Sequence, residues 1–392
     1  MTISFLYNQP RGFDPTTADW LRLDPAIRRF HCSLPDFSPT PLVELPGLAK
    51  RLGVGRVFVK DESKRLGLAA FKVLGVSYAV ARLLADKLQL DISELSFPLL
   101  RSLVRERLPN ATFTTATDGN HGRGLAWIAH QLGLRSVIYL PQGAAEARRQ
   151  AIQDCGGNPV VTDLNYDEAV RLAAEQAREN GWWLVQDTAL TGYEQIPAWI
   201  MQGYTTMAAE AREQLQAAAA SPTHLFLQAG VGSMAAAVQG YWLCHDGSDF
   251  RTVIAEPEQA ACYHHSIAIG DGRAHAVTGD LATIMAGLSC GEPNPLAWPL
   301  LRDTACAFAS CPDFVAEQGM RALARPAPGD PQVVAGESGA VGIGMLVELS
   351  RNLDLAYHRQ RLGLDEHSTV LVFNTEGATD PVNYHQVVCR EG

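Results

Sequence analysis

Short runs of apolar and β-branched residues alternate along the chain with longer, Ala-rich segments in which apolar residues recur at the helical period. The short runs predict strands, which we place at residues 56–59, 137–140, 158–161, 224–227, 252–255 and 369–373. The longer segments predict helices, which we place at residues 71–87, 122–132, 146–154, 166–180, 196–219, 234–244 and 340–352. Strands and helices that alternate at this spacing are typical of an α/β fold with mainly parallel sheets.

Two segments interrupt this alternation. Residues 91–110 have a mixed pattern and are expected to form a connection or an insertion. Residues 326–331 contain three prolines, whose fixed φ and missing N–H predict a loop. The chain has 392 residues, which is longer than most chains that fold around a single hydrophobic core. We therefore expect two domains.

The composition argues against several classes of partner. Lys and Arg number 32 against 42 Asp and Glu, so the formal net charge is −10, and no dense basic block offsets it. Neither nucleic acid nor a membrane surface is therefore an expected partner. The N-terminus shows no secretory signal pattern, and no apolar stretch is long enough to cross a membrane. Eight cysteines, scattered singly, indicate a reduced, cytoplasmic protein, and no metal site is predicted.

A lysine stands at the start of the first long predicted helix. The strand at 56–59 is followed by a polar loop, after which Phe71 and Lys72 open the helix. The positive end of the helix dipole and the apolar neighbours both disfavour an ammonium ion and favour a nucleophilic amine. Taken alone, however, the pattern is more typical of an ordinary solvated lysine.

A loop rich in glycine and hydroxyl side chains covers residues 114–124, between a strand-like segment and a predicted helix. It contains Gly119, Gly122 and Gly124, so its backbone N–H groups can close on a carboxylate. An ordinary Gly-rich turn is the alternative interpretation.

A second glycine loop, residues 228–234, follows the strand at 224–227 and precedes an Ala-rich helix. Gly230 and Gly232 let the backbone approach an anion, and the helix N-terminus adds positive charge, so a phosphate is the natural ligand. The loop lacks the G-x-x-x-x-G-K-[ST] pattern that binds nucleoside triphosphates. It also does not complete the dinucleotide-binding pattern G-x-G-x-x-G of dehydrogenases, because Ala235 stands at the position of the third glycine.

The last predicted strand leads into a polar loop that begins with Thr375. Its hydroxyl could bond a heterocycle nitrogen or simply cap a turn. A lysine, a carboxylate loop, a phosphate loop and a terminal hydroxyl are together what a cofactor with an aldehyde, a phosphate and a pyridine ring requires.

The chain resembles the tryptophan-synthase-β-like group (fold type II) of pyridoxal-phosphate enzymes, and within it those that eliminate ammonia from 2,3-diaminopropionate. The resemblance extends over nearly the whole chain. The strings that carry it are Gly67-Leu-Ala-Ala-Phe-Lys-Val-Leu-Gly75, Ala116-Thr-Asp-Gly-Asn-His-Gly-Arg-Gly124, Val185-Gln-Asp-Thr188, Ile284-Met-Ala-Gly-Leu-Ser-Cys-Gly-Glu-Pro-Asn-Pro295 and Thr375-Glu-Gly-Ala-Thr-Asp-Pro381.

The resemblance implies a role for each matched residue. Lys72 matches the Schiff-base lysine and Phe71 its packing neighbour, while Asn120 matches the residue that bonds the 3′-hydroxyl of the pyridine. Thr375 matches the hydroxyl that faces the pyridine nitrogen, and Glu337 lies in a turn that resembles a cofactor-proximal one. The phosphate-binding loop matches Gly230, Val231, Gly232, Ser233 and Met234. The substrate-binding loop matches Ala116, Thr117, Asp118, Gly119, Asn120 and His121.

The resemblance also implies the fold, the reaction and the partners. It implies two α/β domains with mainly parallel, twisted sheets flanked by helices and pyridoxal 5′-phosphate in the cleft between them. The large domain, residues 1–85 and 201–392, would bind the cofactor, and the mobile smaller domain, residues 86–200, would carry the carboxylate-binding loop. The substrate would be a small amino acid, 2,3-diaminopropionate giving pyruvate and ammonia, and the protein would form a homodimer.

Two aspartates bear on the choice of substrate. Asp118 stands where the serine and threonine dehydratases of this group typically carry Ser. A carboxylate there would repel the substrate carboxylate unless it takes the Cα proton of a D-enantiomer or pairs with the distal ammonium of a diamino acid. Asp187 could share the second role, and we count it, Lys72 and Asp118 as the catalytic residues. A helix N-cap is the alternative for Asp118.

Two other functions remain open at this point. One is a serine or threonine dehydratase of the same fold, which would release ammonia from serine faster than from diaminopropionate. The other is a ligand-binding relative without catalytic activity, although Lys72 and the phosphate loop are intact.

Overall fold

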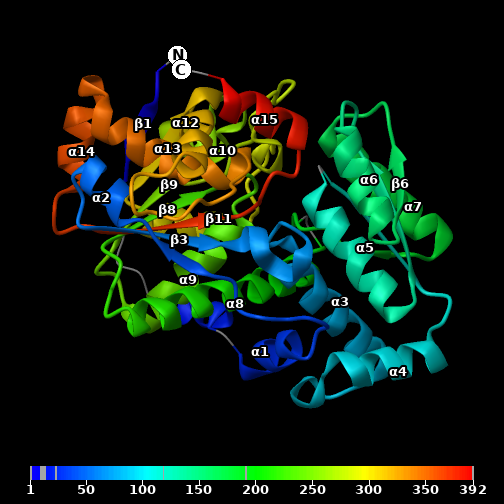
Figure 1. The fold of residues 1–392 in the computed structure, drawn as a ribbon. Coiled ribbons are helices and arrows are strands. Elements are labelled where there is room, and N and C mark those ends of the chain that lie inside the picture. The colour runs from blue at the N-terminus through cyan, green and yellow to red at the C-terminus, as the bar shows by residue number, and fades with distance from the viewer. Residues whose placement is uncertain (1, 9–14, 23, 118, 190–191, 391–392) are drawn as a thin grey trace. The chain divides into compact units, whose positions relative to one another are not determined.

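The computed structural model describes residues 2–8, 15–22, 24–117, 119–189 and 192–390 (Figure 1). The chain divides into two compact units. The larger unit comprises Met1–Leu21, Pro39–Lys64 and Met207–Gly392, and the smaller unit comprises Arg22–Ser38 and Arg65–Thr206.

The larger unit is built on a seven-stranded sheet. Its strands run in the order β1 (Ser4–Tyr7), β10 (Ala307–Cys311), β9 (Arg251–Pro257), β8 (His224–Gln228), β11 (Thr369–Asn374), β3 (Arg56–Asp61) and β2 (Leu42–Glu44). The inner pairs are parallel, and the two edge strands, β1 and β2, pair antiparallel. The predicted parallel architecture is therefore confirmed, with antiparallel edges added.

Helices cover this sheet on both faces, with α12 and α13 on one face and α9 on the other (Figure 1). The helices of the larger unit are α2 (Pro46–Leu52), α9 (Ser233–Asp246), α10 (Cys262–Ile269), α11 (Trp298–Thr304), α12 (Asp313–Ala324), α13 (Glu337–Arg351), α14 (Ala356–Leu362) and α15 (Pro381–Cys389), with 3₁₀ turns at Pro15–Leu21, Glu258–Ala260, Ala286–Leu288 and Leu353–Leu355. Helix α8 (Gln195–Ala217) carries the chain from the smaller unit into the larger one.

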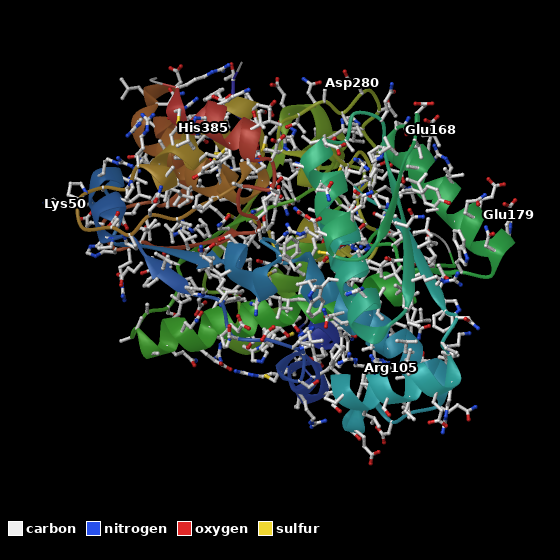
Figure 2. The ribbon with its side chains drawn as sticks, turned by 45° about the vertical axis from the view of Figure 1, so that its right-hand side comes forward. Lys50, Arg105, Glu168, Glu179, Asp280 and His385 are labelled. Carbon is white, nitrogen blue, oxygen red and sulfur yellow. The ribbon has the colours of Figure 1, made fainter. Side chains whose placement is uncertain are left out.

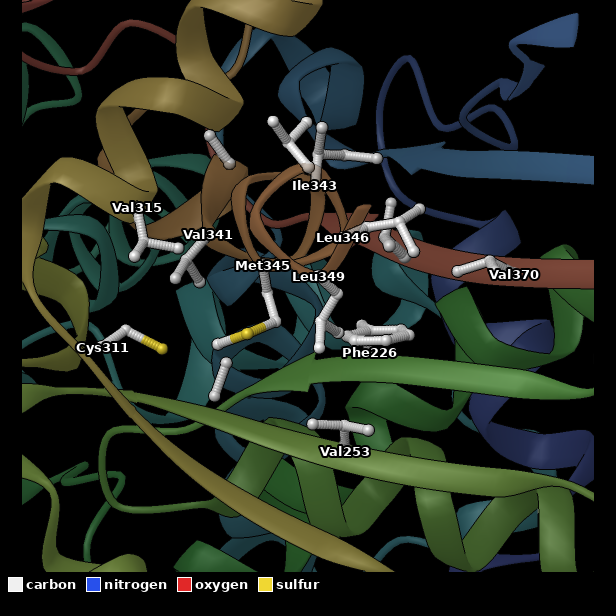
Figure 3. Packing of buried hydrophobic residues seen from close by; sticks show 14 of the residues in the cluster. Phe226, Val253, Cys311, Val315, Val341, Ile343, Met345, Leu346, Leu349 and Val370 are labelled. Carbon is white, nitrogen blue, oxygen red and sulfur yellow. The ribbon is translucent and has the colours of Figure 1, made fainter. Parts of the chain in front are cut away.

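The core of the larger unit lies where α13 packs on the sheet. Met345 and Leu349 of α13 point toward Phe226 of β8 and Val253 of β9 (Figure 3), and all four are almost fully buried. Burial of each such side chain contributes about 1.5–3 kcal/mol, so this layer supports the strand ends that carry the polar loops.

The smaller unit is built on a four-stranded, parallel sheet in the order β6 (Asn158–Val161), β5 (Arg135–Leu140), β4 (Thr112–Ala116) and β7 (Trp183–Leu184). Its helices are α1 (Pro25–Cys32), α3 (Lys72–Leu88), α4 (Phe97–Arg107), α5 (Asn120–Leu132), α6 (Glu146–Asp154) and α7 (Tyr166–Asn180), with a 3₁₀ turn at Ile92–Glu94. A further 3₁₀ segment, Glu62–Gly67, crosses the boundary between the units along the chain.

Both ends of helix α7 (Tyr166–Asn180) carry residues that typically begin and end helices. Asn165 and Glu168 form a reciprocal capping box at its start, and Gly181 adopts a left-handed conformation, with φ of 66°, at its end. Glu168 and Glu179 lie near the two ends of this helix in Figure 2. Both ends of the helix fall at the residues that the sequence predicts.

All six predicted strands and all seven predicted helices are present, with shifts of one to three residues at most of their ends. Residues 91–110, which were expected to form a connection or an insertion, connect α3 to β4 and contain an additional helix, α4, that the sequence did not predict. Phe97, Leu100 and Val104 form its buried stripe, and a proline stands in its first turn. The loop at 326–331 is confirmed.

The boundaries of the compact units differ from the expected domain boundaries, which were 85/86 and 200/201. The units change at 64/65 and 206/207, so helix α3 belongs to the smaller unit. The physical reason is that two glycines let α3 pack closely against its neighbours in the smaller unit. A Cβ atom on Gly75 of α3 would lie 2.5 Å from the Tyr204 ring, and one on Gly124 of α5 would lie 3.1 Å from the Val73 Cα.

No helix among the described residues combines the length and the apolar character that crossing a bilayer requires.

Candidate active site

The glycine loop of the larger unit joins β8 to the N-terminus of α9. Gly232 has a φ of 88°, and a Cβ atom there would lie 2.1 Å from the hydroxyl oxygen of Tyr263. A Cβ atom on Gly230 would lie 3.0 Å from the Cα atom of Leu288. Glycine is therefore required at Gly232 both by conformation and by space. The backbone of this loop, with the first turn of a 14-residue helix, forms a cradle suited to an anion such as phosphate.

Thr375 lies just beyond the end of β11, next to the end of β8. The amide nitrogen Nε2 of Gln228 donates to the Thr375 Oγ1 at 3.0 Å and to the carbonyl oxygens of Phe373 at 3.0 Å and Ser338 at 2.9 Å. The hydroxyl of Thr375 thus bonds a neighbouring strand rather than its own turn. Because the Thr375 oxygen accepts from Gln228, its own hydrogen points elsewhere and can be donated to a ring nitrogen.

Glu337 is the first residue of α13 and is buried. Its Oε1 accepts a hydrogen bond from the side chain of Asn383 in α15. The adjacent Ser338 donates its backbone N–H to Oε1 of Glu376 at 3.1 Å. The structure therefore brings the start of α13 together with Gln228 and Thr375, while a direct cofactor role for Glu337 stays a prediction.

In the smaller unit, Lys72 is the first residue of α3, and its Nζ lies 2.6 Å from Oδ2 of the buried Asp187. Burial raises the pKa of Asp187, but the charges of Lys72 and His121 outweigh it and lower this pKa to about 2. Asp187 is thus ionised at neutral pH. The sequence argument about Lys72 considered only the helix dipole and apolar neighbours, and it needs correction, because a carboxylate at this distance favours the ammonium form.

Three further residues hold Asp187 in place. His121 lies in the first turn of α5, with Nε2 2.7 Å from the backbone oxygen of Val185 and Nδ1 3.7 Å from Asp187 Oδ2. A carbonyl can only accept, so Nε2 of His121 carries a hydrogen. The Nε2 of Gln186 donates to Asp187 Oδ1 at 3.3 Å and to the hydroxyl of Tyr166 at 3.2 Å.

Gln186 also connects Asp187 to the end of β4, where the loop of residues 116–120 begins. Its Oε1 accepts from the hydroxyl of Thr115 at 2.8 Å and from the backbone N–H of Ala116 at 3.0 Å. Gln186 and Tyr166 are not among the site residues that the sequence predicts. Gln186 could have been noticed, because it stands inside the string Val185-Gln-Asp-Thr188, whereas nothing in the sequence distinguishes Tyr166.

The loop that is predicted to bind the substrate carboxylate runs from Ala116, the last residue of β4, to Asn120, the first residue of α5. Thr117 Oγ1 accepts from the backbone N–H groups of Gly119 at 2.9 Å and Gly122 at 3.3 Å, so its hydroxyl serves as a cap for α5. Asp118 lies outside the described residues, so its predicted roles stay predictions.

Phe71 immediately precedes α3 and packs against Tyr204, with ring centroids 4.7 Å apart. The Nζ of Lys72 lies 5.8 Å from the centroid of the Phe71 ring. The hydroxyl of Tyr204 is buried and has no hydrogen-bond partner among the described residues, and burial raises its pKa. Tyr204 is a second tyrosine that the sequence analysis did not select.

Comparison with known proteins places the chain in a family. Residues 34–363 match the family model described as pyridoxal-phosphate dependent enzyme. The chain is 51% identical over 366 residues to the diaminopropionate ammonia-lyase of Salmonella typhimurium, and the match covers 92% of this chain and 91% of that protein.

Solved structures agree with this result. The holo diaminopropionate ammonia lyase of Escherichia coli superposes with a TM-score of 0.91 at 45% identity, covering 99% of this chain and 97% of that one. The same enzyme in complex with D-serine superposes with a TM-score of 0.90 at 44% identity, over 99% and 97% of the two chains. The chain therefore belongs to the pyridoxal-phosphate-dependent enzymes and, among them, to the diaminopropionate ammonia-lyases, as its motifs predict.

Proposed function

We propose that this chain eliminates ammonia from 2,3-diaminopropionate with the help of pyridoxal 5′-phosphate, giving pyruvate and two molecules of ammonia. The observation that carries the proposal is the ion pair between Lys72 and Asp187, in which a buried carboxylate holds a primary ammonium at 2.6 Å. The names of the relatives support the same reaction.

The residues present fit the cofactor. The glycine loop has no room for side chains at Gly230 and Gly232, and it leads into the N-terminus of α9, which favours an anion such as phosphate. Residues 230–234 would hold the phosphate, Lys72 would bond the aldehyde through its amine, Thr375 would donate to the pyridine nitrogen, and Asn120 would bond the 3′-hydroxyl. When bound, pyridoxal phosphate supplies a ring that delocalises the negative charge left at Cα by proton removal.

Asp187 provides selectivity for a diamino acid. When the nitrogen of Lys72 is bonded to the cofactor's aldehyde, it no longer approaches Asp187 as a free ammonium. The Asp187 carboxylate, whose pKa is lowered by a neighbouring positive charge, can then accept the β-ammonium of diaminopropionate, which is a primary ammonium like that of Lys72. Serine has no β-ammonium to take the place of the Lys72 ammonium beside this carboxylate, and a buried charge that loses an oppositely charged partner is strongly disfavoured.

The substrate carboxylate would be bound by the 116–121 loop. The N–H groups there lie at the positive end of α5, and Thr117 fixes the turn by accepting from Gly119 and Gly122. The Nζ of Lys72, once it is no longer bonded to the cofactor, would take the Cα proton of the L-enantiomer. Asp118 would take the corresponding proton of the D-enantiomer from the opposite face.

The proposal extends to the domains, the oligomer and the location of the protein. By family resemblance, a large domain of residues 1–85 and 201–392 binds the cofactor, and residues 86–200 form a smaller, mobile domain. The protein forms a homodimer, which family resemblance alone supports, and light scattering at several concentrations would measure its mass. The protein is cytoplasmic, which its eight singly scattered cysteines support.

The experiment that tests the substrate compares ammonia release from D- and L-2,3-diaminopropionate with release from D- and L-serine, using the purified protein loaded with pyridoxal phosphate. We expect kcat/KM to be higher for at least one diaminopropionate enantiomer than for either serine. A higher kcat/KM for serine would contradict the proposed substrate and would leave the cofactor assignment standing.

A further inference from the structure

The segment Ile284–Pro295 carries a family string whose function the site described above does not explain. In the larger unit it lies directly against the glycine loop. A Cβ atom on Gly230 would meet the Leu288 Cα at 3.0 Å and the sulfur of Cys290 at 3.3 Å. Near the end of the segment, the backbone N–H of Asn294 donates to the Val231 carbonyl at 2.8 Å. The segment therefore forms one wall of the phosphate cradle.

The side chain of Asn294 is fully buried, and its orientation follows from its neighbours. Its Oδ1 accepts the backbone N–H of Leu296 at 3.0 Å, and a backbone N–H can only donate. The amide nitrogen Nδ2 must therefore be the atom that faces Ser233, whose Oγ lies 2.8 Å away. Because an amide nitrogen can only donate, the oxygen of Ser233 accepts.

This contact determines the direction of the Ser233 hydroxyl. A serine hydroxyl has one hydrogen and two lone pairs, and here a lone pair is directed at Asn294. The hydrogen of Ser233 consequently points away from Asn294. Ser233 is the first residue of α9, where the backbone N–H groups also favour an anion. An ionised phosphate accepts hydrogen bonds, so it gains from a serine that is held in the donor orientation.

We propose that Asn294 is a positioning residue that fixes Ser233 as a hydrogen-bond donor to the phosphate of the cofactor. The inference rests on the proposed function, in which residues 230–234 hold that phosphate. Asn294 acts through Ser233 and is assigned no contact with the reacting atoms. Substitution of its side chain leaves the loop other supports, because the Val231 carbonyl also accepts from the hydroxyl of Tyr263 at 2.9 Å.

The test measures binding of pyridoxal 5′-phosphate and of pyridoxal, which lacks the phosphate, to the full-length chain freed of cofactor, by equilibrium absorbance titration. Asn294→Ala should raise the Kd for pyridoxal phosphate about tenfold or more, as expected for one lost charge-assisted hydrogen bond. The Kd for pyridoxal should change less than about twofold. Asn294→Asp, which keeps the acceptor for Leu296 but loses the donor and adds a negative charge, should weaken phosphate-dependent binding further.

A double-mutant cycle tests whether Asn294 acts through Ser233. If it does, Asn294→Ala has little further effect on the Kd for pyridoxal phosphate once Ser233→Ala has removed the hydroxyl. Equal effects of Asn294→Ala in both backgrounds, or an equal loss of pyridoxal and pyridoxal-phosphate binding, would overturn the inference. Asn180→Ala, which removes an exposed amide at the end of α7, is the control and should leave both Kd values unchanged.

The outcome also separates this inference from the function on which it rests. If the unsubstituted chain bound pyridoxal as tightly as pyridoxal phosphate, the phosphate role of residues 230–234 would itself be wrong. If the unsubstituted chain prefers pyridoxal phosphate and Asn294→Ala keeps that preference, only the inference about Asn294 fails.

Discussion

Asp187→Asn removes one negative charge from the site and keeps the size of the side chain. The substitution removes the interaction between a buried carboxylate and a primary ammonium. In the pair with Lys72, the nitrogen and the carboxylate oxygen lie 2.6 Å apart. Loss of one partner of a buried, hydrogen-bonded charge pair costs about 2–5 kcal/mol. We therefore expect kcat/KM for diaminopropionate to fall roughly 30- to 5,000-fold.

The assay for this variant is steady-state ammonia release from both diaminopropionate enantiomers and, in parallel, from serine. Since serine has no β-ammonium for Asp187 to bind, kcat/KM for serine should fall far less. Glu175→Gln, which removes the same charge from the exposed face of α7, is the control and should change kcat/KM less than about twofold. An equal loss with diaminopropionate and serine would refute the ammonium-binding role of Asp187.

The lowered pKa of Asp187 should also make the stability of the protein depend on pH. The charges of Lys72 and His121 hold the pKa of this carboxyl at about 2 against an ordinary 3.8, despite the opposing effect of burial. A carboxyl whose pKa is lowered by folding stabilises the protein above its unfolded pKa and loses this contribution as the pH falls through the folded value. For the protein freed of cofactor, in which Lys72 is a free ammonium, we expect about 2 kcal/mol of the free energy of unfolding to disappear between about pH 4 and about pH 2. Asp187→Asn should lack this component in urea unfolding series, and an unchanged pH dependence would contradict the assignment.

Three other substitutions test the site. Lys72→Ala should reduce turnover more than about 10³-fold in the ammonia-release assay while the fold persists by circular dichroism, and substantial residual turnover would contradict its role. Gly232→Ala places a Cβ atom 2.1 Å from the Tyr263 hydroxyl at a φ of 88°, so the Kd for pyridoxal phosphate should rise and urea unfolding should show a loss of about 1–3 kcal/mol; unaltered values would show that the cradle tolerates a side chain. Asp118→Asn should lower kcat for the D-enantiomer more than for the L-enantiomer, whereas equal losses would favour ammonium binding.

The sequence predicted the architecture well where local signals are strong. Helix α7 was placed correctly at both ends, because Asn165, Glu168 and Gly181 are local capping signals. Strand β10 was missed, because its residues Ala307–Cys311 are mostly small and contain no β-branched side chain. Helix α4 was missed, because charged residues interrupt its apolar stripe.

Candidate residues for the site could be named from the sequence, but the pairs that they form could not. The motifs pointed to Lys72, Asp187 and Ser233 as separate candidates. Lys72 and Asp187 lie 115 positions apart, and Ser233 lies 61 positions from Asn294, so only the tertiary structure brings these partners together. The ion pair of Lys72 in particular reverses the protonation that its position on the helix suggested.

The central claim is that the amine of Lys72 bonds the aldehyde of pyridoxal phosphate. The most direct measurement is borohydride reduction of the protein loaded with cofactor, followed by mass spectrometry of its peptides. We predict a yellow protein whose colour is lost on reduction and whose phosphopyridoxyl label is found on Lys72. A label on another lysine, or no label on a protein that still releases ammonia from diaminopropionate, would contradict the account.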